Sequence, residues 1–137
     1  MIMINMQKND IEIRWRGGLS KIESIDDSWS EIRLFKNGEK VGDTGFTISN
    51  YQIAVDTIDI EEKFQRQGYG RLLVSLLKGL SRLLNKPIVL YSLRDSYQFY
   101  VAMGFTKLRK IHDEKKKIVI VIFKSKNEPK IEELEMI

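Results

Sequence analysis

The chain has 137 residues, 42% of them hydrophobic and 31% charged, which is typical of one globular domain. Cysteine is absent and His112 is the single histidine. This excludes disulfide frameworks, cysteine nucleophiles, zinc sites with thiolate ligands and metal sites built from several histidines. The net charge of +4 at pH 7 favours anionic ligands without choosing among nucleotides, nucleic acid and acidic surfaces.

Neither a membrane span nor a secretory signal is expected. No apolar run approaches the roughly 18 residues that would cross a bilayer. Residues 1–6 are apolar, but they lack a basic region before them and a small-residue cleavage site after them. We therefore expect a cytoplasmic protein.

The first half of the chain alternates apolar and polar residues, which is the pattern of half-buried β-strands. Gly17-Gly18 ends the first strand, and residues 19–29 form a weak helix or loop at most. Asn37-Gly38 is a strong hairpin signal, so the strands that follow are expected to be antiparallel. The predicted strands cover residues 11–15, 31–36, 41–48 and 51–60.

The period changes after Gly68, where leucines recur at the spacing of an α-helix that ends at Asn85-Lys86-Pro87. The leucines that share its predicted apolar face are Leu72, Leu73, Leu76, Leu77, Leu80, Leu83 and Leu84. Residues 87–93 are almost wholly apolar, as in a strand covered on both faces. Strand, helix and strand in series imply a crossover and a locally parallel strand pair.

The last third of the chain completes a single domain over residues 1–126. A short helix is predicted over residues 96–103, ended by Gly104. Residues 106–111 and 117–123 are predicted to form a closing hairpin around His112-Asp113-Glu114, followed by an acidic tail over 127–137. The predicted fold class is α/β with a mixed (α+β) sheet, antiparallel at first, with a parallel step in the middle.

The loop before the long helix has the features of a phosphate site. A helix N-terminus carries unpaired N–H groups and partial positive charge. Gly68 and Gly70 allow close approach to the backbone, and Arg66 and Arg71 add positive charge. The loop has neither the GxxxxGK[ST] pattern of nucleoside triphosphatases nor the GxGxxG pattern of dinucleotide-binding folds.

Two motifs resemble those of the GNAT superfamily of N-acetyltransferases. Gln65-x-x-Gly68-x-Gly70, between a strand and a helix, resembles the family's acetyl-CoA motif [RQ]xxGx[GA]. The stretch from Phe99-Tyr100 to Gly104-Phe105 resembles its second signature, FY-x-x-x-GF, on the short helix after the fifth strand. Both have the family's spacing and order, and the flanking strands extend the resemblance of fold over residues 11–123.

The resemblance implies an acetyl-CoA-dependent N-acetyltransferase, with CoA lying between the splayed strands 51–60 and 87–93. The pyrophosphate would lie on backbone N–H groups of the loop, and the pantetheine arm and acetyl carbonyl would pair with the backbone of strand 51–60. The residues so implied in cofactor binding are Ile58, Ile60, Gln65, Arg66, Gln67, Gly68, Tyr69, Gly70 and Arg71.

The implied reaction is direct attack of a neutral primary amine on the thioester in a ternary complex. Tyr100 matches the tyrosine that protonates the departing thiolate, and a phenol with a pKa of about 10 is protonated at pH 7. Asp56 is the candidate base, because it shares the strand parity of the two cofactor-binding isoleucines. A β-bulge would change that parity, in which case Asp59 or Glu61 competes.

The sequence departs from the family pattern in two places. Leu93 stands where many members carry asparagine, which removes a side-chain contact to the CoA arm. Residues 16–30 are too few for the two helices that usually wall the acceptor site. The resemblance then implies an open acceptor site, either completed by a second subunit of a homodimer or suited to an exposed amine on a large substrate.

Other interpretations of the same residues stay open. Gly68 and Gly70 also fit a plain tight turn, Tyr100 a core aromatic residue and Asp56 a solvated carboxylate. The rival function is a non-catalytic module of this fold that binds CoA or a protein. The basic residues within 107–117 fit a solvated hairpin or an attraction for the CoA 3′-phosphate or an acidic acceptor, and without interleaved aromatics they do not predict nucleic-acid binding.

Overall fold

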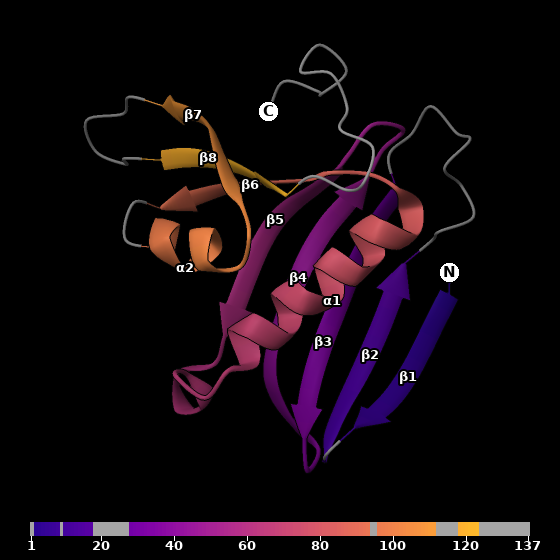
Figure 1. The fold of residues 1–137 in the computed structure, drawn as a ribbon. Helices are drawn as coiled ribbons and strands as arrows, with labels where there is room; N and C mark the ends of the chain where they lie inside the picture. Colours follow the sequence, from indigo (N-terminus) through magenta and orange to yellow (C-terminus); the bar gives the residue numbers. More distant parts are fainter. Residues whose placement is uncertain (1, 9, 18–27, 94–95, 112–117, 124–137) are drawn as a thin grey trace.

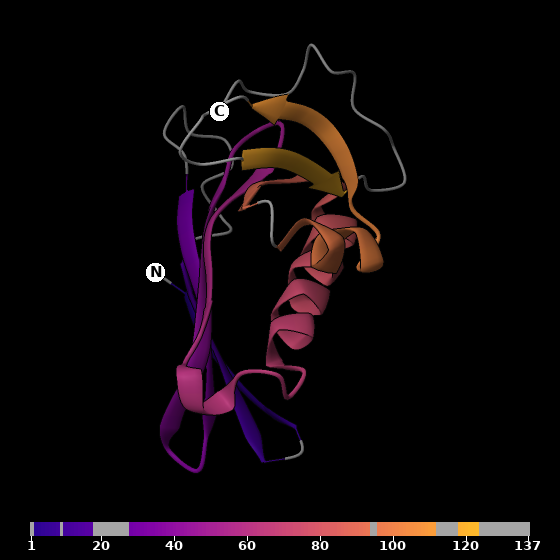
Figure 2. The same cartoon turned by 90° about the vertical axis from the view of Figure 1, so that its left-hand side faces the viewer.

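An eight-stranded mixed sheet with helices on one face forms the described part of the molecule (Figures 1 and 2). The computed structural model describes residues 2–8, 10–17, 28–93, 96–111 and 118–123. The predicted weak helix before residue 28, the turn at His112-Asp113-Glu114 and the tail over 127–137 lie outside these residues. The strand order is β1-β2-β3-β4-β5-β6-β8-β7.

The first five strands are antiparallel neighbours in chain order, and four of them confirm predicted strands. They are β1 (Ile2–Lys8), β2 (Ile11–Gly17), β3 (Ser28–Lys36), β4 (Glu39–Ile48) and β5 (Ile53–Ile60). Asn37 and Gly38 have φ values of 50° and 81°, the left-handed pair that a tight two-residue hairpin requires. The predicted turn between β3 and β4 is therefore confirmed.

The N-terminal strand β1 was not among the predicted elements. It pairs along β2, from Ile2 opposite Gly17 to Lys8 opposite Ile11. Its sequence, IMINMQK, has no clear alternation and few β-branched residues, so neither pattern nor propensity marks it as a strand. The strand is defined by its backbone pairing with β2, which the residue pattern does not predict.

The long helix α1 (Tyr69–Leu84) packs diagonally across one face of the sheet (Figure 1). Leu73, Leu77 and Leu80 are buried, as the leucine spacing predicts. The prediction that Leu83 belongs to the buried face is wrong, because 77% of the residue is exposed. It lies near the C-terminal end of the helix, which stops at Asn85 with φ 54°.

The chain then crosses over to β6 (Ile88–Leu93), which lies parallel to β5, so the predicted parallel step is confirmed. The remaining elements are α2 (Tyr97–Ala102), β7 (Thr106–Ile111) and β8 (Ile118–Phe123). Among the described residues, no helix is long and apolar enough to cross a membrane.

The pairing of β5 with β6 is short, and this opens the sheet at its centre. Only residues 53–55 pair with residues 88–90, although β5 runs on to Ile60 and β6 to Leu93. The two strands therefore separate after Val55 and Leu90. This is the splayed pair that the resemblance implied.

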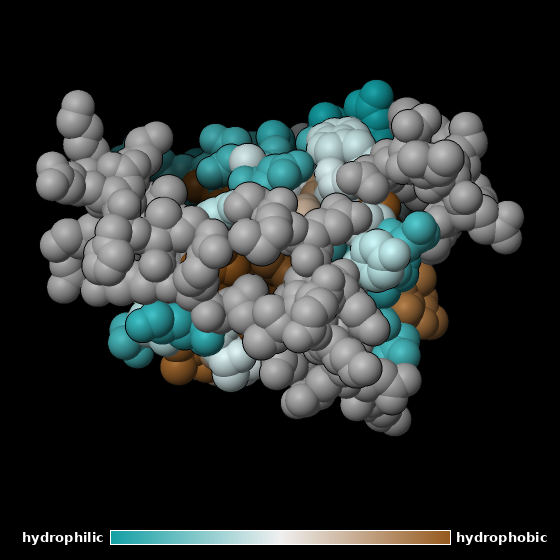
Figure 3. Space-filling model, turned by 90° about the horizontal axis from the view of Figure 1, so that it is seen from above, coloured by the Kyte–Doolittle hydropathy of each residue, from teal (hydrophilic) through white to brown (hydrophobic). Residues whose placement is uncertain are grey.

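The main core lies between α1 and the facing side of the sheet. The largest fully buried apolar side chains there are Ile32, Leu34, Phe46, Ile48, Ile53, Leu73, Leu77 and Ile88. A second, smaller cluster on β6 and β8 consists of Val89, Ile120 and Ile122. Seen from above, the described surface mixes hydrophilic side chains with smaller apolar areas (Figure 3), as is usual for globular proteins.

We expect Leu77→Ala to lower the free energy of unfolding by about 2–5 kcal/mol, because it leaves a cavity under α1. Urea denaturation would measure the loss. The control is Leu83→Ala on the same helix, whose exposed side chain should change stability by less than about 0.5 kcal/mol. Equal losses in both variants would contradict this assignment of the buried face.

Candidate functional site

The loop between β5 and α1 turns sharply through two left-handed residues. After the short 3-10 helix η1 (Glu62–Phe64), Arg66 has φ 63° and Gly68 has φ 91°. Gly68 is also the N-cap of α1. A left-handed N-cap with no side chain leaves the first turn of the helix open to solvent.

This loop presents a continuous row of unpaired N–H groups. The last bond before it runs from the Gln65 N–H to the Glu62 carbonyl (3.2 Å), and the first bond of α1 runs from the Leu72 N–H to the Gly68 carbonyl (3.1 Å). Between them, the N–H groups of residues 66–71 have no hydrogen-bond partner among the described residues, and no side chain caps the helix. We call this row the amide cradle.

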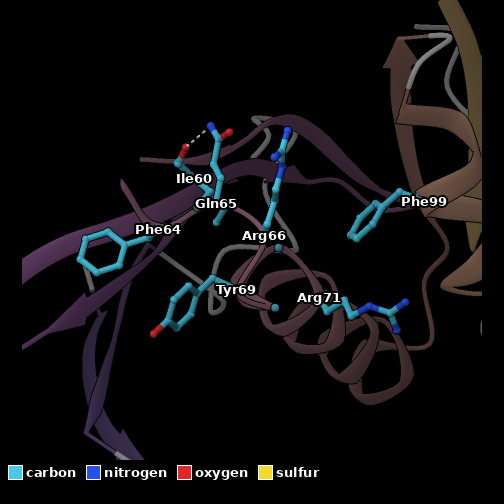
Figure 4. A pocket seen from close by; sticks show the side chains of 9 residues that line it. Ile60, Phe64, Gln65, Arg66, Tyr69, Arg71 and Phe99 are labelled. Atoms are coloured by element: carbon cyan, nitrogen blue, oxygen red, sulfur yellow. Dashed lines mark hydrogen bonds between the residues drawn. The ribbon is translucent and has the colours of Figure 1, made fainter. Parts of the chain in front are cut away.

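The glutamine side chains of the loop turn away from the amide cradle. Gln65 Nε2 donates to the Ile60 carbonyl oxygen at 3.1 Å (Figure 4), and Gln67 Nε2 donates to the Lys63 carbonyl oxygen at 3.3 Å. Both bonds brace the loop against the segment before it. The motif glutamine Gln65 therefore shapes the loop, and the amide cradle stays accessible.

An open cavity of about 380 Å³ lies over the amide cradle. Phe99 points into it from α2, opposite Phe64 and Tyr69 (Figure 4). A Cβ atom at Gly70 would meet the Phe99 ring at 3.7 Å, whereas one at Gly68 would meet nothing within 4 Å. The residues that line the cavity are Ile60, Phe64, Gln65, Arg66, Gly68, Tyr69, Gly70, Arg71 and Phe99.

The cavity is electrostatically suited to an anion. Arg66 and Arg71 both line it with exposed side chains, and the first turn of α1 contains no acidic residue. The helix dipole adds partial positive charge at the same end. Unpaired amides, arginines and the missing Cβ atoms together fit a diphosphate group.

Ile58 and Ile60 of β5 face the α1 side of the sheet and are half-buried against the core. Ile60 lines the cavity, whereas Ile58 is not among the lining residues. The Ile60 carbonyl already accepts the bond from Gln65. Ile58 and Ile60, which the resemblance assigned to the pantetheine arm, therefore lie between the point where β5 separates from β6 and the cavity.

A β-bulge in β5 interrupts the alternation of side chains from which Asp56 was expected to point the same way as Ile58 and Ile60. Val55 pairs with Phe46 and Thr57 with the adjacent Gly45, so Asp56 is the extra, unpaired residue. Its side chain is exposed. The competing carboxylates are also exposed: Asp59 lies on the face opposite Ile60, and Glu61 follows the strand. The geometry brings none of the three into the cavity lining.

Tyr100 is half-buried on α2, with its ring edge-on to those of Phe99 and Phe105 at centroid distances of 5.1 and 5.7 Å. Burial raises the pKa of its phenol above the usual value. Tyr100 does not itself line the cavity; its neighbour Phe99 does. The structure thus joins Ile60 and most of the loop residues at one cavity, with Ile58, Gln67, Asp56 and Tyr100 outside its lining.

Sequence reasoning missed two contributors on or near α2. Phe99 faces the amide cradle, and only its place beside Tyr100 in the second motif hinted at this. Lys78 of α1 donates from Nζ to the Met103 carbonyl oxygen at 2.7 Å, at the end of α2. A lysine side chain bonding the last carbonyls of a helix stabilises that end, so Lys78 fixes α2 against α1.

No family model and no curated protein matches the sequence. Solved structures do match. The ribosomal-protein-S18-alanine N-acetyltransferase of Escherichia coli is similar with a TM-score of 0.64 and 16% identity, over 70% of this chain and 68% of that one. ElaA of Escherichia coli is similar with a TM-score of 0.62 and 19% identity, over 69% and 67%.

The PaiA N-acetyltransferase of Thermoplasma acidophilum, solved in complex with coenzyme A, is similar with a TM-score of 0.60 and 15% identity, over 69% of this chain and 59% of that one. At these identities the likeness is one of fold. The chain has the GNAT acyl-CoA N-acyltransferase fold, as the sequence motifs implied.

We expect Gly68→Ala to destabilise the protein by about 1–2 kcal/mol, because an L-residue at φ 91° is strained whatever the space around it. Thermal and urea unfolding would measure this. Gly79→Ala is the matched control. That glycine lies inside α1 with open space around it, so alanine there should stabilise by about 0.5–1 kcal/mol. Shifts of the same sign would contradict the left-handed turn.

Proposed function

We propose that this protein is an acetyl-CoA-dependent N-acetyltransferase that transfers an acetyl group to a primary amine by direct attack in a ternary complex. The observation that carries the proposal is the amide cradle, which opens on a cavity lined by Arg66 and Arg71. The GNAT fold supports it, since similar folds are N-acetyltransferases, one of them solved with coenzyme A.

The loop would hold the cofactor mainly through backbone groups. The N–H groups of residues 66–71 would donate to the pyrophosphate, and Arg66 and Arg71 would add charge-assisted bonds. Hydrogen bonds to charged groups contribute about 1.5–3 kcal/mol each. From the cavity, the pantetheine arm would follow β5 past Ile60 and Ile58 toward the residues where β5 and β6 are no longer paired.

Bound acetyl-CoA supplies an activated acyl group and a thiolate leaving group. Asp56 accepts one proton from the incoming ammonium, directly or through water, and passes it to solvent. The neutral nitrogen then forms the C–N bond as the C–S bond breaks. Tyr100 gives its phenolic proton to the thiolate and recovers the second proton from the nitrogen, so each ammonium consumed releases one proton to solvent.

The raised pKa of Tyr100 suits this role, because a phenol that stays protonated keeps a proton to give. Its acid form is present below the raised pKa and is lost as the pH rises through it. The second candidate function is a non-catalytic CoA-binding module. It is favoured by the position of Tyr100 outside the cavity lining and by the exposure of Asp56.

We expect Gly70→Asp to weaken CoA binding by about tenfold or more, because a carboxylate would enter the amide cradle and repel the diphosphate. Isothermal titration with CoA would measure the affinity. Gly79→Asp places the same charge further along α1, where nothing lies within 4 Å, and should leave the affinity nearly unchanged. An unaltered affinity in Gly70→Asp would remove the pyrophosphate assignment.

Tyr100→Phe should lower kcat by about a hundredfold or more while leaving CoA affinity unchanged, because it deletes the proton donor and keeps the ring. Free thiol released from acetyl-CoA with a panel of amines would give the rates. Tyr97→Phe, the same change on the same helix, is the control. CoA binding without transfer by the wild-type protein would favour the non-catalytic module, and full activity in Tyr100→Phe would exclude the acid role.

A further inference from the structure

The short helix α2 ends in a Schellman motif, in which two backbone N–H groups beyond the helix bond back to its last turn. Met103 is the C-cap, and Gly104 follows it with φ 92°. The Phe105 N–H donates to the Tyr100 carbonyl oxygen at 2.9 Å. The Gly104 N–H donates to the Val101 carbonyl oxygen at 3.0 Å. The last two residues of the second sequence motif, Gly104-Phe105, therefore close the helix that carries Tyr100.

The same motif places the ring of Tyr100 against the core. A Schellman motif is often accompanied by an apolar contact between the two residues that its outer bond joins. Here these residues are Tyr100 and Phe105, whose rings meet edge-on with 5.7 Å between centroids. Phe105 is 2% exposed and belongs to the main core. It therefore gives the phenol ring a buried surface to pack on.

Lys78 of α1 completes the hydrogen bonding at this helix end. Among the described residues, no backbone N–H outside the helices and strands donates to the Met103 carbonyl oxygen, and Lys78 Nζ donates to it at 2.7 Å. The same ammonium lies 4.9 Å from the centroid of the Phe123 ring, which packs on the Phe105 ring at 5.7 Å. Lys78 thus contacts both the C-cap of α2 and the ring behind Phe105.

The ammonium of Lys78 is committed to this place. The residue is half-buried and makes no ion pair within the described part of the chain. A charge removed from water is costly unless hydrogen bonds or a partner compensate it, and here a carbonyl oxygen and an aromatic face do so. A Cβ atom at Gly104 would lie 3.6 Å from Nζ, so the ammonium packs directly on the left-handed residue of the motif.

We propose that Lys78 is a positioning residue for acetyl transfer: by binding the C-cap of α2 it keeps the Tyr100 phenol in place to protonate the departing thiolate. The inference rests on the transferase function proposed above. Lys78 is not among the residues that line the cavity over the amide cradle, so it acts through Tyr100 and not on CoA. A helix of six residues has little stability of its own, and a misplacement of about 1 Å can lower a rate about a hundredfold.

The test begins with Lys78→Met, which keeps most of the alkyl stem and removes the ammonium. We expect kcat to fall about tenfold, while KM for acetyl-CoA and the affinity for CoA stay unchanged. Thiol release with a panel of amines gives the rates, and isothermal titration gives the affinity. Arg82→Met is the matched control. The guanidinium of Arg82 also lies over the Phe123 ring, at 5.4 Å, but Arg82 is exposed, so kcat should not change.

Adding Lys78→Met to Tyr100→Phe separates positioning from a general loss of structure. Residues that act through the same group have non-additive effects. When the phenol is absent, Lys78→Met should therefore lower kcat no further. A further tenfold loss in the double variant would show that Lys78 acts independently of Tyr100 and would overturn the proposal.

A second readout needs no catalysis. Burial raises the pKa of the Tyr100 phenol, so a ring released from Phe105 should titrate closer to the ordinary value of about 10. NMR of tyrosines labelled at Cζ should show this fall of the Tyr100 pKa in Lys78→Met and not in Arg82→Met. Full kcat in Lys78→Met would overturn the positioning role alone. An altered Tyr100 titration without transfer to any amine by the wild-type protein would instead overturn the proposed function on which the role rests.

Discussion

The interruption of pairing between β5 and β6 is the constraint on which the proposed path of the pantetheine arm depends. The bulge at Asp56 adds one residue to β5, and pairing with β6 ends at the residue before it. Bulges bend a strand and increase its local twist. Beyond this point no backbone hydrogen bonds join β5 to β6, and the proposed mechanism places the pantetheine arm along β5 toward this unpaired stretch. A continuous parallel pair would occupy the same backbone groups with its own hydrogen bonds.

The amide cradle depends on a second local constraint, the left-handed turn at Arg66 and Gly68. An ordinary N-cap would satisfy one of the free N–H groups with its own side chain. Gly68 has no side chain to do so, and Gln65 and Gln67 bond backward to η1 and β5. The loop therefore keeps its shape without using the N–H donors that an anion would need.

Repeating residue patterns predicted the secondary-structure elements, whereas single irregularities within an element could not be predicted from the sequence. The leucine spacing located α1, Asn37-Gly38 located the hairpin, and the strand-helix-strand order predicted the parallel step. The bulge at Asp56 has no residue signature, so the side to which that carboxylate points could not be settled. Phe99 and Tyr100 are adjacent on a short helix, and which of them faces the amide cradle depends on how α2 rotates as it packs.

Two contacts between α1 and the segment around α2 connect the two motifs. Lys78 Nζ binds the Met103 carbonyl at the end of α2 and lies 4.9 Å from the centroid of the Phe123 ring on β8. Phe99 in turn approaches Gly70 in the first turn of α1. The helix that presents the amide cradle therefore also contacts α2 at Phe99 and at its C-cap, Met103, on either side of Tyr100 in the sequence. A short helix of six residues has little stability of its own. The position of the phenol therefore depends on tertiary packing, which includes these contacts with α1 and the ring of Phe105 at 5.7 Å from that of Tyr100.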